Sequence, residues 1–523
     1  MYGGGVAEQC SAKIQLFFRA EKLEDKDTLS KSDPYLCLFD YTGQLKRGLI
    51  GKTETIQNDL NPQWKTCMTV NFYFERKQEM LATVIDDDGG KSDADNEMLM
   101  TVPFQLAQVM SARGHTLKLQ SGKSLLFITA VEINQNVNDQ FRLAFFGRKL
   151  AKMDTFGLSD PYFFLYRVQP NGTRKELYKS SVIGNTLDPT WGPLPLFPLN
   201  ELSTANFDEK CLEFECYDED TFSDDLIGKL KLSLNDLIDS YSNKTPLKLR
   251  RDGKDKSYGE IYAGSAEIEH QPSFAEYLSR GLQINLAVSV DFTGSNGDPR
   301  QPNSLHYMNP NSPNQYVRAI MSVGDILMQY DTDKMVPAFG FGARLPDGNI
   351  SHFFHLNMEQ NPYVPGVQGV LDAYGRCLTQ VKLSGPTNFA PSIRAVTDGA
   401  RKSEGVYTVH LILTDGEITD MPQTIDAIVA ADSAPLSIVI VGVGSDCGFE
   451  MMDQLDGDEA ALVDGNNTIC GRDLVQFVPF RKFINAPPEA LASEVLKEIP
   501  DQVCKWAHRT GYKPPFPPQQ QQQ

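Results

Sequence analysis

The sequence predicts two all-β antiparallel sandwiches followed by an α/β domain with a doubly wound parallel sheet. Three observations predict this organisation: an internal repeat in the first half, short strand-like segments throughout that repeat, and a change to strand–helix alternation after Glu269. The length of 523 residues agrees, because one hydrophobic core rarely serves more than about 250–300 residues.

The internal repeat has four landmarks that recur at one offset of 127 residues. The four pairs are Asp27 and Asp154, Asp33 and Asp160, Asn61 and Asp188, and Trp64 and Trp191. So many matches at one offset indicate two homologous modules, which we place at residues 8–134 and 138–269. Segments such as AKIQLFFRA and PYFFLYRV are short, aromatic and β-branched. About eight such strands in ~130 residues are typical of an antiparallel sandwich.

A different pattern begins after a linker at residues 270–277. The segments LQINLAVSV, VPAFGFGA, YTVHLILT and APLSIVIVGVG are nearly continuous in apolar residues, and helix-like segments such as APSIRAVTDGARK lie between them. Alternation of this kind predicts a parallel sheet covered by helices at residues 278–500. Residues 501–523 form a C-terminal segment, and its tail PPFPPQQQQQ is expected to bury nothing and to be disordered or polyproline-like.

The charge balance limits the possible partners. A net charge of −19 repels nucleic acid and anionic lipid alike, so binding to either surface requires a positive charge that can be switched on. We therefore expect no nucleic-acid partner. The nine cysteines are an odd number without a CxxC pair, which favours reduced thiols in a cytoplasmic protein. No segment approaches the roughly 18 apolar residues of a spanning helix, so we expect membrane contact to be peripheral.

Each module collects carboxylates in two loops that are distant in sequence. Ca²⁺ takes several oxygen ligands at once, so this pattern predicts calcium sites. The candidates are Asp27, Asp33, Asp86, Asp88 and Asp95 in the first module, and Asp154, Asp160, Asp218, Asp220 and Asp225 in the second. In the first module the fifth ligand is open between Asp93, Asp95 and Glu97. Asp is also common in ordinary turns, but five positions repeated twice favour calcium.

Three apolar residues stand at the predicted tips of the second module's acidic loops: Phe156, Leu158 and Phe222. Two bound Ca²⁺ ions change the local charge by +4, which draws the loops to an anionic leaflet. We expect these three side chains to dip into the lipid.

A third candidate site lies at the end of the first strand of the α/β domain. Ligands in such folds bind beyond the carboxyl ends of the strands. There Asp291, Thr293 and Ser295 offer one carboxylate and two hydroxyls, and Thr387 and Asp415 follow later elements. With waters, this set suits Mg²⁺ or Mn²⁺, and with few negative ligands the ion can accept a carboxylate from a partner protein. The competing interpretation is a strand-end loop with helix-capping hydroxyls.

Catalytic signatures do not occur in the sequence. It contains no Walker loop, kinase HRD, GxSxG or HExxH motif, so we expect no enzyme activity.

These residues together resemble the copines, cytosolic proteins with two C2 domains followed by a von Willebrand factor A-type domain. The segments VDFTGSNGDP, SLHY, PAFGFGA, GPTNF, TDGEITD, IVIVGVG, LDGD and VQFVPFR stand in copine order, and each module has its SDPY loop and Pro-x-Trp turn. The resemblance implies calcium-dependent binding to phospholipid membranes, at the plasma membrane, with the A-type domain recruiting target proteins. It also implies that Asp291, Thr293, Ser295, Thr387 and Asp415 form a metal-ion-dependent adhesion site. A cell-adhesion receptor and a membrane-targeted enzyme are the alternatives.

Overall fold

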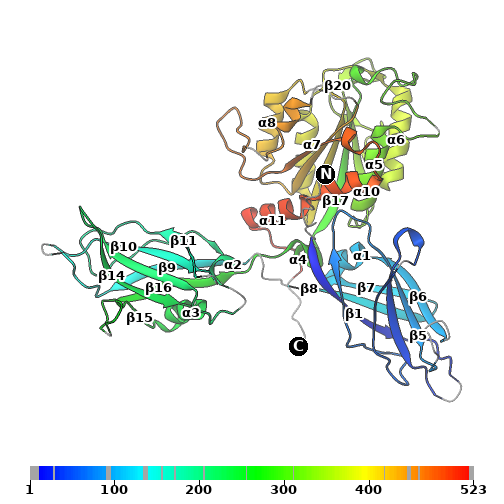
Figure 1. Ribbon diagram of the computed structural model, residues 1–523. Coiled ribbons are helices and arrows are strands. Elements are labelled where there is room, and N and C mark those ends of the chain that lie inside the picture. The colour runs from blue at the N-terminus through cyan, green and yellow to red at the C-terminus, as the bar shows by residue number, and fades with distance from the viewer. Residues whose placement is uncertain are drawn as a thin grey trace, which may run out of the picture. The chain divides into compact units, whose positions relative to one another are not determined.

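The computed structural model describes residues 11–27, 30–46, 48–89, 96–133, 139–154, 157–169, 172–203, 206–254, 256–309, 311–416, 418–444, 449–457 and 460–516. The chain forms two compact units. The first unit consists of the residues up to Ile133, which form the first module, and the residues from Phe274 onward, which form the α/β domain. The second unit is the second module, from Asn134 to Ser273 (Figure 1). In the described part of the chain no helix is long and apolar enough to cross a membrane.

The first module is a sandwich of two four-stranded antiparallel sheets, ordered β4-β1-β8-β7 and β3-β2-β5-β6. Inward residues alternate with outward ones along β1, so one face of the sheet is buried. The strands are β1 Ala12–Glu21, β2 Pro34–Asp40, β3 Gly48–Lys52, β4 Met68–Phe72, β5 Glu79–Asp86, β6 Met98–Gln105, β7 Thr116–Ser121 and β8 Ser124–Glu132, with the short helix α1 Leu106–Ser111.

The second module repeats the sandwich, with sheets ordered β11-β10-β13-β14 and β12-β9-β16-β15. Its core centres on stacked rings, because Phe163 and Phe214 lie 4.6 Å apart. The elements are β9 Gln140–Arg148, β10 Pro161–Val168, β11 Arg174–Lys179, β12 Phe197–Pro198, α2 Leu199–Leu202, β13 Leu212–Asp218, β14 Asp225–Leu232, α3 Leu234–Asn243, β15 Leu247–Lys248 and β16 Glu260–Glu269.

The α/β domain contains a seven-stranded sheet of order β21-β18-β17-β24-β25-β26, in which β22 also pairs with β18. The pairings among β18, β17, β24, β25 and β26 are parallel, as the apolar segments predict. The edge strands β21 and β22 run antiparallel to β18, so the sheet is mixed. The strands are β17 Gln283–Asp291, β18 Met335–Phe341, β19 Ala343–Arg344, β20 Ile350–Ser351, β21 Phe354–His355, β22 Tyr363–Pro365, β23 Lys382–Leu383, β24 Val406–Thr414, β25 Leu436–Gly442 and β26 Val475–Pro479.

Helices cover both faces of this sheet (Figure 1). One face packs against α5, α6, α10 and α11, and the other against α7, α8 and α9. The helices are α4 Phe274–Ser279, α5 Gln315–Leu327, α6 Gly366–Gln380, α7 Ala390–Lys402, α8 Met421–Ala430, α9 Glu450–Asp453, α10 Pro488–Leu496 and α11 Ile499–Thr510. Short 3₁₀ turns span Thr42–Gln44, Arg113–His115, Gly294–Asn296 and Phe480–Phe483.

Phe74 joins the first module to the α/β domain. Its ring is fully buried and lies 4.6 Å from the Tyr330 ring and 5.1 Å from the Phe274 ring. The Tyr330 hydroxyl donates to the Phe74 carbonyl over 3.1 Å, and Lys77 forms an ion pair of 2.8 Å with Asp325. The hydrophobic cores of the two parts are therefore continuous.

The C-terminal segment differs from its prediction. Helix α11 crosses residue 500 and buries Val503 and Trp506 against the sheet. The prediction that the tail buries nothing is wrong for Pro514–Phe516, because Pro514 is buried and the Phe516 amide donates to the Arg280 carbonyl over 3.1 Å. The Phe516 ring also lies 3.9 Å from the Arg113 guanidinium. An aromatic side chain between prolines carries enough apolar surface to pack.

Candidate metal sites

The strand register explains how distant acidic loops meet in the first module. Strand β2 begins just after Asp33, β5 ends at Asp86, and the two strands pair with Pro34 opposite Asp86. The Asp33 amide donates to Asp86 Oδ1 over 2.6 Å. Ligand oxygens of Asp27, Asp86 and Asp88 come within 4.8 Å of one another. Four of the five predicted ligands therefore share one end of the sandwich, and Asp95 lies outside the described residues.

Asp86 is the buried member of this cluster. Burial, together with the charges of Asp27 and Asp88, raises its pKa above the usual range. Its Oδ2 atom is buried without a hydrogen-bond partner among the described residues, a costly state for a carboxylate. A divalent cation would pair with this oxygen and neutralise the repulsion, so the residues present fit Ca²⁺.

The second module repeats this strand register, but among the described residues only Asp27, Asp86 and Asp88 of the first module bring three ligand oxygens within 4.8 Å of one another. Pro161 pairs with Asp218 across β10 and β13, and the Asp160 amide donates to Asp218 Oδ1 over 2.5 Å. Asp218 is completely buried and its Oδ2 has no partner in the described part of the chain. Burial first, and then the charges of Asp154 and Asp160, raise the pKa of Asp218.

The outer carboxylates of this module repel one another as well. Desolvation and the charges of Asp154, Asp218 and Asp225 raise the pKa of Asp220. The charges of Asp154 and Asp160 therefore act on Asp218, and those of Asp154, Asp218 and Asp225 act on Asp220. Sequence reasoning missed Asp224, which accepts hydrogen bonds from the Tyr162 hydroxyl (2.6 Å) and the Asp220 amide (3.1 Å). The position of Asp224 directly before the predicted ligand Asp225 could have identified it from the sequence.

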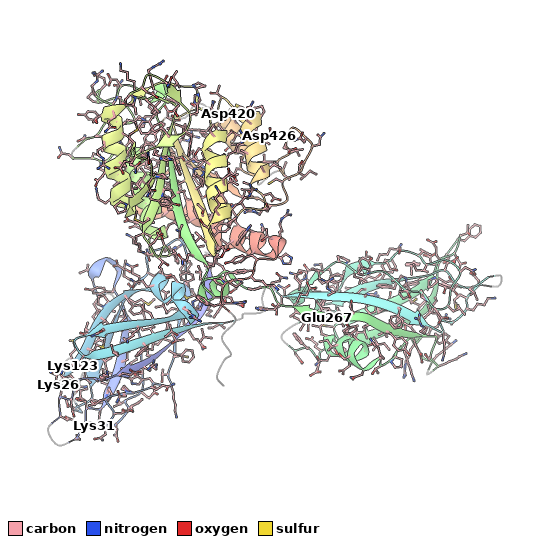
Figure 2. All side chains as sticks on the ribbon, turned by 180° about the vertical axis from the view of Figure 1, so that it is seen from behind. Lys26, Lys31, Lys123, Glu267, Asp420 and Asp426 are labelled. Atoms are coloured by element: carbon pink, nitrogen blue, oxygen red, sulfur yellow. The ribbon has the colours of Figure 1, made fainter. Side chains whose placement is uncertain are left out.

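Two of the three predicted membrane-contact residues are exposed at these loops. Phe222 is 100% exposed and Leu158 is 40% exposed, while Phe156 lies outside the described residues. A bare phenyl ring in water is unfavourable, so Phe222 is suited to lipid. In the first module the end that carries the acidic cluster holds Lys26 and Lys31 (Figure 2) and the exposed Met98, which pairs with Ile85 next to Asp86.

The predicted site of the α/β domain lies at the carboxyl end of β17. Asp291 is fully buried, with Oδ1 accepting from the Thr293 amide (2.7 Å) and Oδ2 from the Thr414 hydroxyl (2.6 Å). The Ser295 hydroxyl lies 3.0 Å from that of Thr293 and 2.9 Å from Asp415 Oδ1. Four predicted ligands thus converge on one point. Thr387 stands outside this hydrogen-bond network of described residues and is held through its backbone by Thr419.

The carboxylates of Asp291 and Asp415 repel each other at this poorly solvated site. Burial, reinforced by the charge of Asp415, raises the pKa of Asp291 to about 7, and burial also raises the pKa of Asp415. A small divalent cation would stabilise both carboxylates, and the facing hydroxyls of Thr293 and Ser295 complete an oxygen set that fits Mg²⁺ or Mn²⁺.

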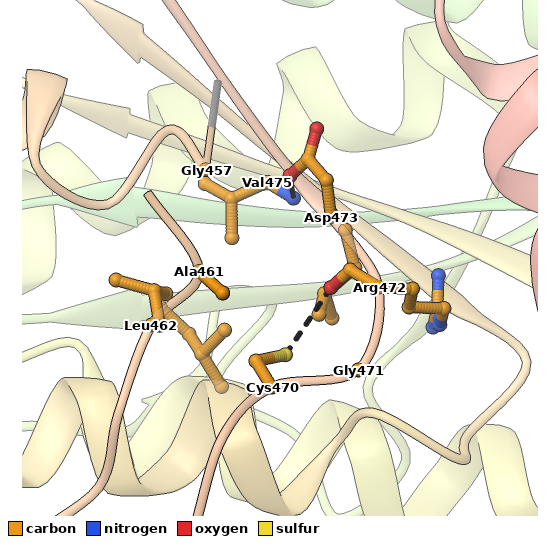
Figure 3. Close-up of a pocket in the computed structure, with 10 residues that line it drawn as sticks. Gly457, Ala461, Leu462, Cys470, Gly471, Arg472, Asp473 and Val475 are labelled. Carbon is orange, nitrogen blue, oxygen red and sulfur yellow. Dashed lines mark hydrogen bonds between the residues drawn. The ribbon is translucent and has the colours of Figure 1, made fainter. Parts of the chain in front are cut away.

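A cavity of about 200 Å³ also lies in the α/β domain, at the amino end of β26 (Figure 3). Ile428, Leu462 and Val475 give it apolar walls, and the Cys470 thiol inside it donates to the Arg472 carbonyl. Because β26 and β17 run in the same direction, a cavity at the amino end of β26 lies at the opposite edge of the sheet from Asp291, which stands at the carboxyl end of β17. Ligands of parallel sheets usually bind at the carboxyl ends of the strands.

Comparison with known proteins agrees with this architecture. Residues 304–515 match the family described as Copine, and residues 16–120 and 145–249 each match the C2 domain. Copine-E of Dictyostelium discoideum is 39% identical over 524 aligned residues, which cover 96% of this chain and 88% of that relative. The chain belongs to the copine family. Its modules are C2 domains and its α/β domain is the copine, von Willebrand factor A-like domain.

Solved structures resemble parts of this copine. The structure titled BON1-C2B is 21% identical, covers 26% of the chain and 94% of its own length, and has a TM-score of 0.23. The calcium-bound pair of C2 domains of Extended-Synaptotagmin 2 is 16% identical and covers 50% of the chain and 98% of its own length, with a TM-score of 0.20.

Family membership supports calcium-dependent membrane binding in general for this copine. Its C2 domains imply Ca²⁺ as a cofactor and phospholipid membranes as a binding surface, and its copine domain implies protein interactions. Copines are generally adaptors without enzyme activity.

Proposed function

We propose that this copine moves from the cytoplasm to anionic membranes, at the plasma membrane, when calcium rises, and that its A-type domain then recruits target proteins. In this proposal Ca²⁺ binds the first C2 domain through Asp27, Asp33, Asp86, Asp88 and Asp95, and the second through Asp154, Asp160, Asp218, Asp220 and Asp225.

The observation that carries the proposal is the buried Oδ2 of Asp218, which has no hydrogen-bond partner among the described residues and lies within a group of repelling carboxylates. Without a cation this group repels an anionic surface. With calcium bound, the group no longer repels, and Leu158 and the fully exposed Phe222 can enter the lipid. Burying a phenylalanine side chain contributes about 1.5–3 kcal/mol, which strengthens membrane binding about tenfold to a hundredfold once electrostatic attraction has brought the domain to the surface.

The A-type domain would act after docking. Asp291, Thr293, Ser295, Thr387 and Asp415 would hold Mg²⁺ or Mn²⁺. Because only two of these residues are carboxylates, the ion would remain electrophilic and would accept a carboxylate from a target protein. The buried Asp291 would hold the ion from beneath, while the exposed side of Ser295 leaves room for the incoming group.

Vesicle co-sedimentation tests the proposal. Full-length protein is mixed with phosphatidylserine–phosphatidylcholine vesicles across a calcium titration, beside the double variant Asp154→Asn/Asp160→Asn. We expect pelleting that requires calcium and that the double variant shifts to higher calcium. Pelleting that is equally strong in chelator would contradict the proposal.

A further inference from the structure

A small sheet of three short strands, β20-β19-β23, lies beside the candidate metal site of the α/β domain, and Figure 1 shows β20 at the top of this domain. Strand β23 leads directly into Ser384, which forms a β-bridge with Thr293. The Gly294 amide donates to the Ser384 carbonyl over 2.6 Å, and the Ser384 amide donates to the Gly342 carbonyl over 3.0 Å. Backbone hydrogen bonds therefore fix the small sheet to the loop that carries Thr293 and Ser295.

The register of the small sheet aligns three exposed side chains. Arg344 on β19 lies directly opposite Lys382 on β23 and Ile350 on β20, and residues that are opposite one another in antiparallel strands share one face. The preceding residue of β19, Ala343, is fully buried, whereas Ile350 is 41% exposed and both cations are exposed. Ile350, Arg344 and Lys382 therefore form an outward-facing set, which we call the cationic row.

The cationic row brings two positive charges together without a neutralising group. Like charges directly opposite each other across two strands are destabilising. Within the described part of the chain neither Arg344 nor Lys382 forms an ion pair. Asp347, in the turn between β19 and β20, accepts instead from the backbone amide (2.9 Å) and the side-chain amide (3.0 Å) of Asn349. On a protein with a net charge of −19, this local excess of positive charge fits an anionic ligand.

A metal ion at the neighbouring site would leave the positive charge of the row in place. The carboxylates of Asp291 and Asp415 carry two negative charges, which one divalent cation balances. Arg344 is also partly held, because its Nη1 donates to the Gly348 carbonyl over 2.7 Å. Its other donors stay free for a carboxylate, and a group that is already held loses less entropy on binding. The row is therefore available to the ligand of the metal site.

The separation of the row from the metal site matches an extended peptide. Arg344 follows Gly342 by two residues, and Lys382 precedes Ser384 by two. Gly342 and Ser384 are the residues of the small sheet that adjoin Thr293, since a Cβ atom at Gly342 would lie 2.4 Å from the Thr293 methyl group. Two residues of a strand span about 7 Å. Residues i and i+2 of a bound extended chain have the same spacing, so they can reach the metal site and the row together.

We propose that the cationic row selects the target proteins of the A-type domain. It binds an acidic side chain two residues from the carboxylate that the metal ion accepts, and Ile350 contacts an apolar side chain beyond it. The partner is therefore an exposed, extended segment of a protein in which acidic and apolar residues alternate. This inference rests on the proposed function for the carboxylate at the metal ion.

The test measures the binding of fluorescent peptides to the full chain by anisotropy, in Mn²⁺ and in chelator. The probes are the end-blocked peptides GLDLDLG, GLDLNLG and GLNLNLG, which differ only in the number of carboxylates. In Mn²⁺ the second carboxylate should strengthen binding to the wild type about fivefold, which is the order of magnitude that two exposed charge pairs supply.

The row variant is Arg344→Gln/Lys382→Gln. It should lose the gain from the second carboxylate and bind GLDLNLG as the wild type does. The matched control, Arg401→Gln/Lys402→Gln, removes one arginine and one lysine from exposed positions at the end of α7, where the chain turns toward the amino end of β24. It should keep the gain. Because the row variant relieves a repulsion, its melting temperature should equal or exceed that of the wild type, which shows that it folds.

Reversal of one charge gives a second, independent variant. Lys382→Glu places a carboxylate opposite Arg344, where opposite charges attract across the strands. The fold is then retained, and GLDLDLG should bind no better than GLDLNLG. A gain from the second carboxylate that persists in Lys382→Glu or in the row variant would overturn the proposal. Loss of the gain in the control as well would also overturn it, because general charge would then explain the binding.

A vesicle measurement tests a lipid in place of a protein segment. The row variant should sediment with phosphatidylserine vesicles at the same calcium concentration as the wild type. If it needs more calcium there, and its peptide binding is unchanged, the row contacts lipid and the assignment to a protein partner is wrong.

The metal arm separates this inference from the proposed function. Binding of GLDLNLG that requires Mn²⁺, with no gain for GLDLDLG, overturns the row alone. A gain for GLDLDLG that the row variant abolishes, but that is equally large in chelator, supports the row as an acidic-segment site and overturns the metal-bound carboxylate of the proposed function.

Discussion

The side-chain amide of Asn296 donates a hydrogen bond to Asp415 Oδ1 over 2.8 Å. The other end of that amide accepts from the Tyr316 hydroxyl over 2.7 Å, and Tyr316 is fully buried. An amide has distinct donor and acceptor ends, so Tyr316 determines that the donor end faces Asp415. The orientation of this candidate metal ligand therefore depends on two residues outside the predicted site.

Removing the Asn296 amide should weaken metal binding. Outer partners of metal ligands typically contribute about 10–100-fold in affinity, so we expect Asn296→Ala to raise the Mn²⁺ dissociation constant of the A-type domain about tenfold. Tyr316→Phe should have a smaller effect in the same direction. The measurement is Mn²⁺ titration by electron paramagnetic resonance, with Ca²⁺ present to fill the C2 domains. The control is Asn349→Ala in an exposed turn, and unchanged affinity in Asn296→Ala would refute the role of the amide.

The buried Asp291 should make the stability of the A-type domain depend on pH. Its folded-state pKa of about 7 lies above the ordinary value near 3.8. The folded state therefore binds the proton of Asp291 more tightly than the unfolded state does. The resulting contribution to the free energy of unfolding is complete below about pH 4 and is lost as the pH rises toward 7. In chelator, the melting temperature of the wild type relative to Asp291→Asn should fall between about pH 4 and about pH 7.

The melting temperature of the wild type is compared with that of Asp291→Asn because buried histidines change the stability with pH in the opposite direction. Burial lowers the pKa of His410 to about 3, so that group destabilises the fold as the pH falls below about 6.5. Calorimetry of both proteins cancels this contribution. A difference in melting temperature that does not change with pH would show that Asp291 is not protonated in the folded protein.

Phe222 should affect membrane residence without affecting calcium binding. The ring is fully exposed and makes no contribution to the core, so Phe222→Ala should fold normally. We expect about a fivefold to tenfold faster release from phosphatidylserine vesicles, since part of the roughly 1.5–3 kcal/mol of phenyl burial is lost. Stopped-flow release after chelator addition measures it, and Ile469→Ala, an exposed residue of the A-type domain, is the control. Equal release rates in all three proteins would exclude insertion of Phe222.

Phe74 should hold the first C2 domain and the A-type domain in one folding unit. Because its ring fills the junction beside Tyr330 and Phe274, these two domains should unfold in one calorimetric transition. Phe74→Ala should destabilise the unit by about 3–5 kcal/mol and separate the transition into two. Phe164→Ala in the second C2 domain should leave this transition in place. Two separate transitions in the wild type would show that the junction is weak.

Local pattern was sufficient for most of the secondary structure. The predicted helix APSIRAVTDGARK coincides with α7 at Ala390–Lys402, and the predicted strand YTVHLILT differs from β24 by one residue. The acidic residues were visible in the sequence as a repeated pattern, but the pairing of Pro34 with Asp86 across β2 and β5, which brings Asp33 beside Asp86, is a contact of the folded chain. The hydrophobic periodicity that marks helices and strands depends only on residues that are near one another in the sequence, so it can be recognised in a single sequence.

The sequence by itself therefore determined the domain order, the strands, the repeated carboxylates and the resemblance to copines. Only the tertiary structure decided that Asn296 and Tyr316 orient Asp415, that Arg344 lies opposite Lys382 beside the candidate metal site, and that Phe74 packs on Tyr330. These contacts join residues far apart along the chain, and no local spacing encodes them. They depend on which faces the folded layers bury against one another, which is settled by packing of the whole core.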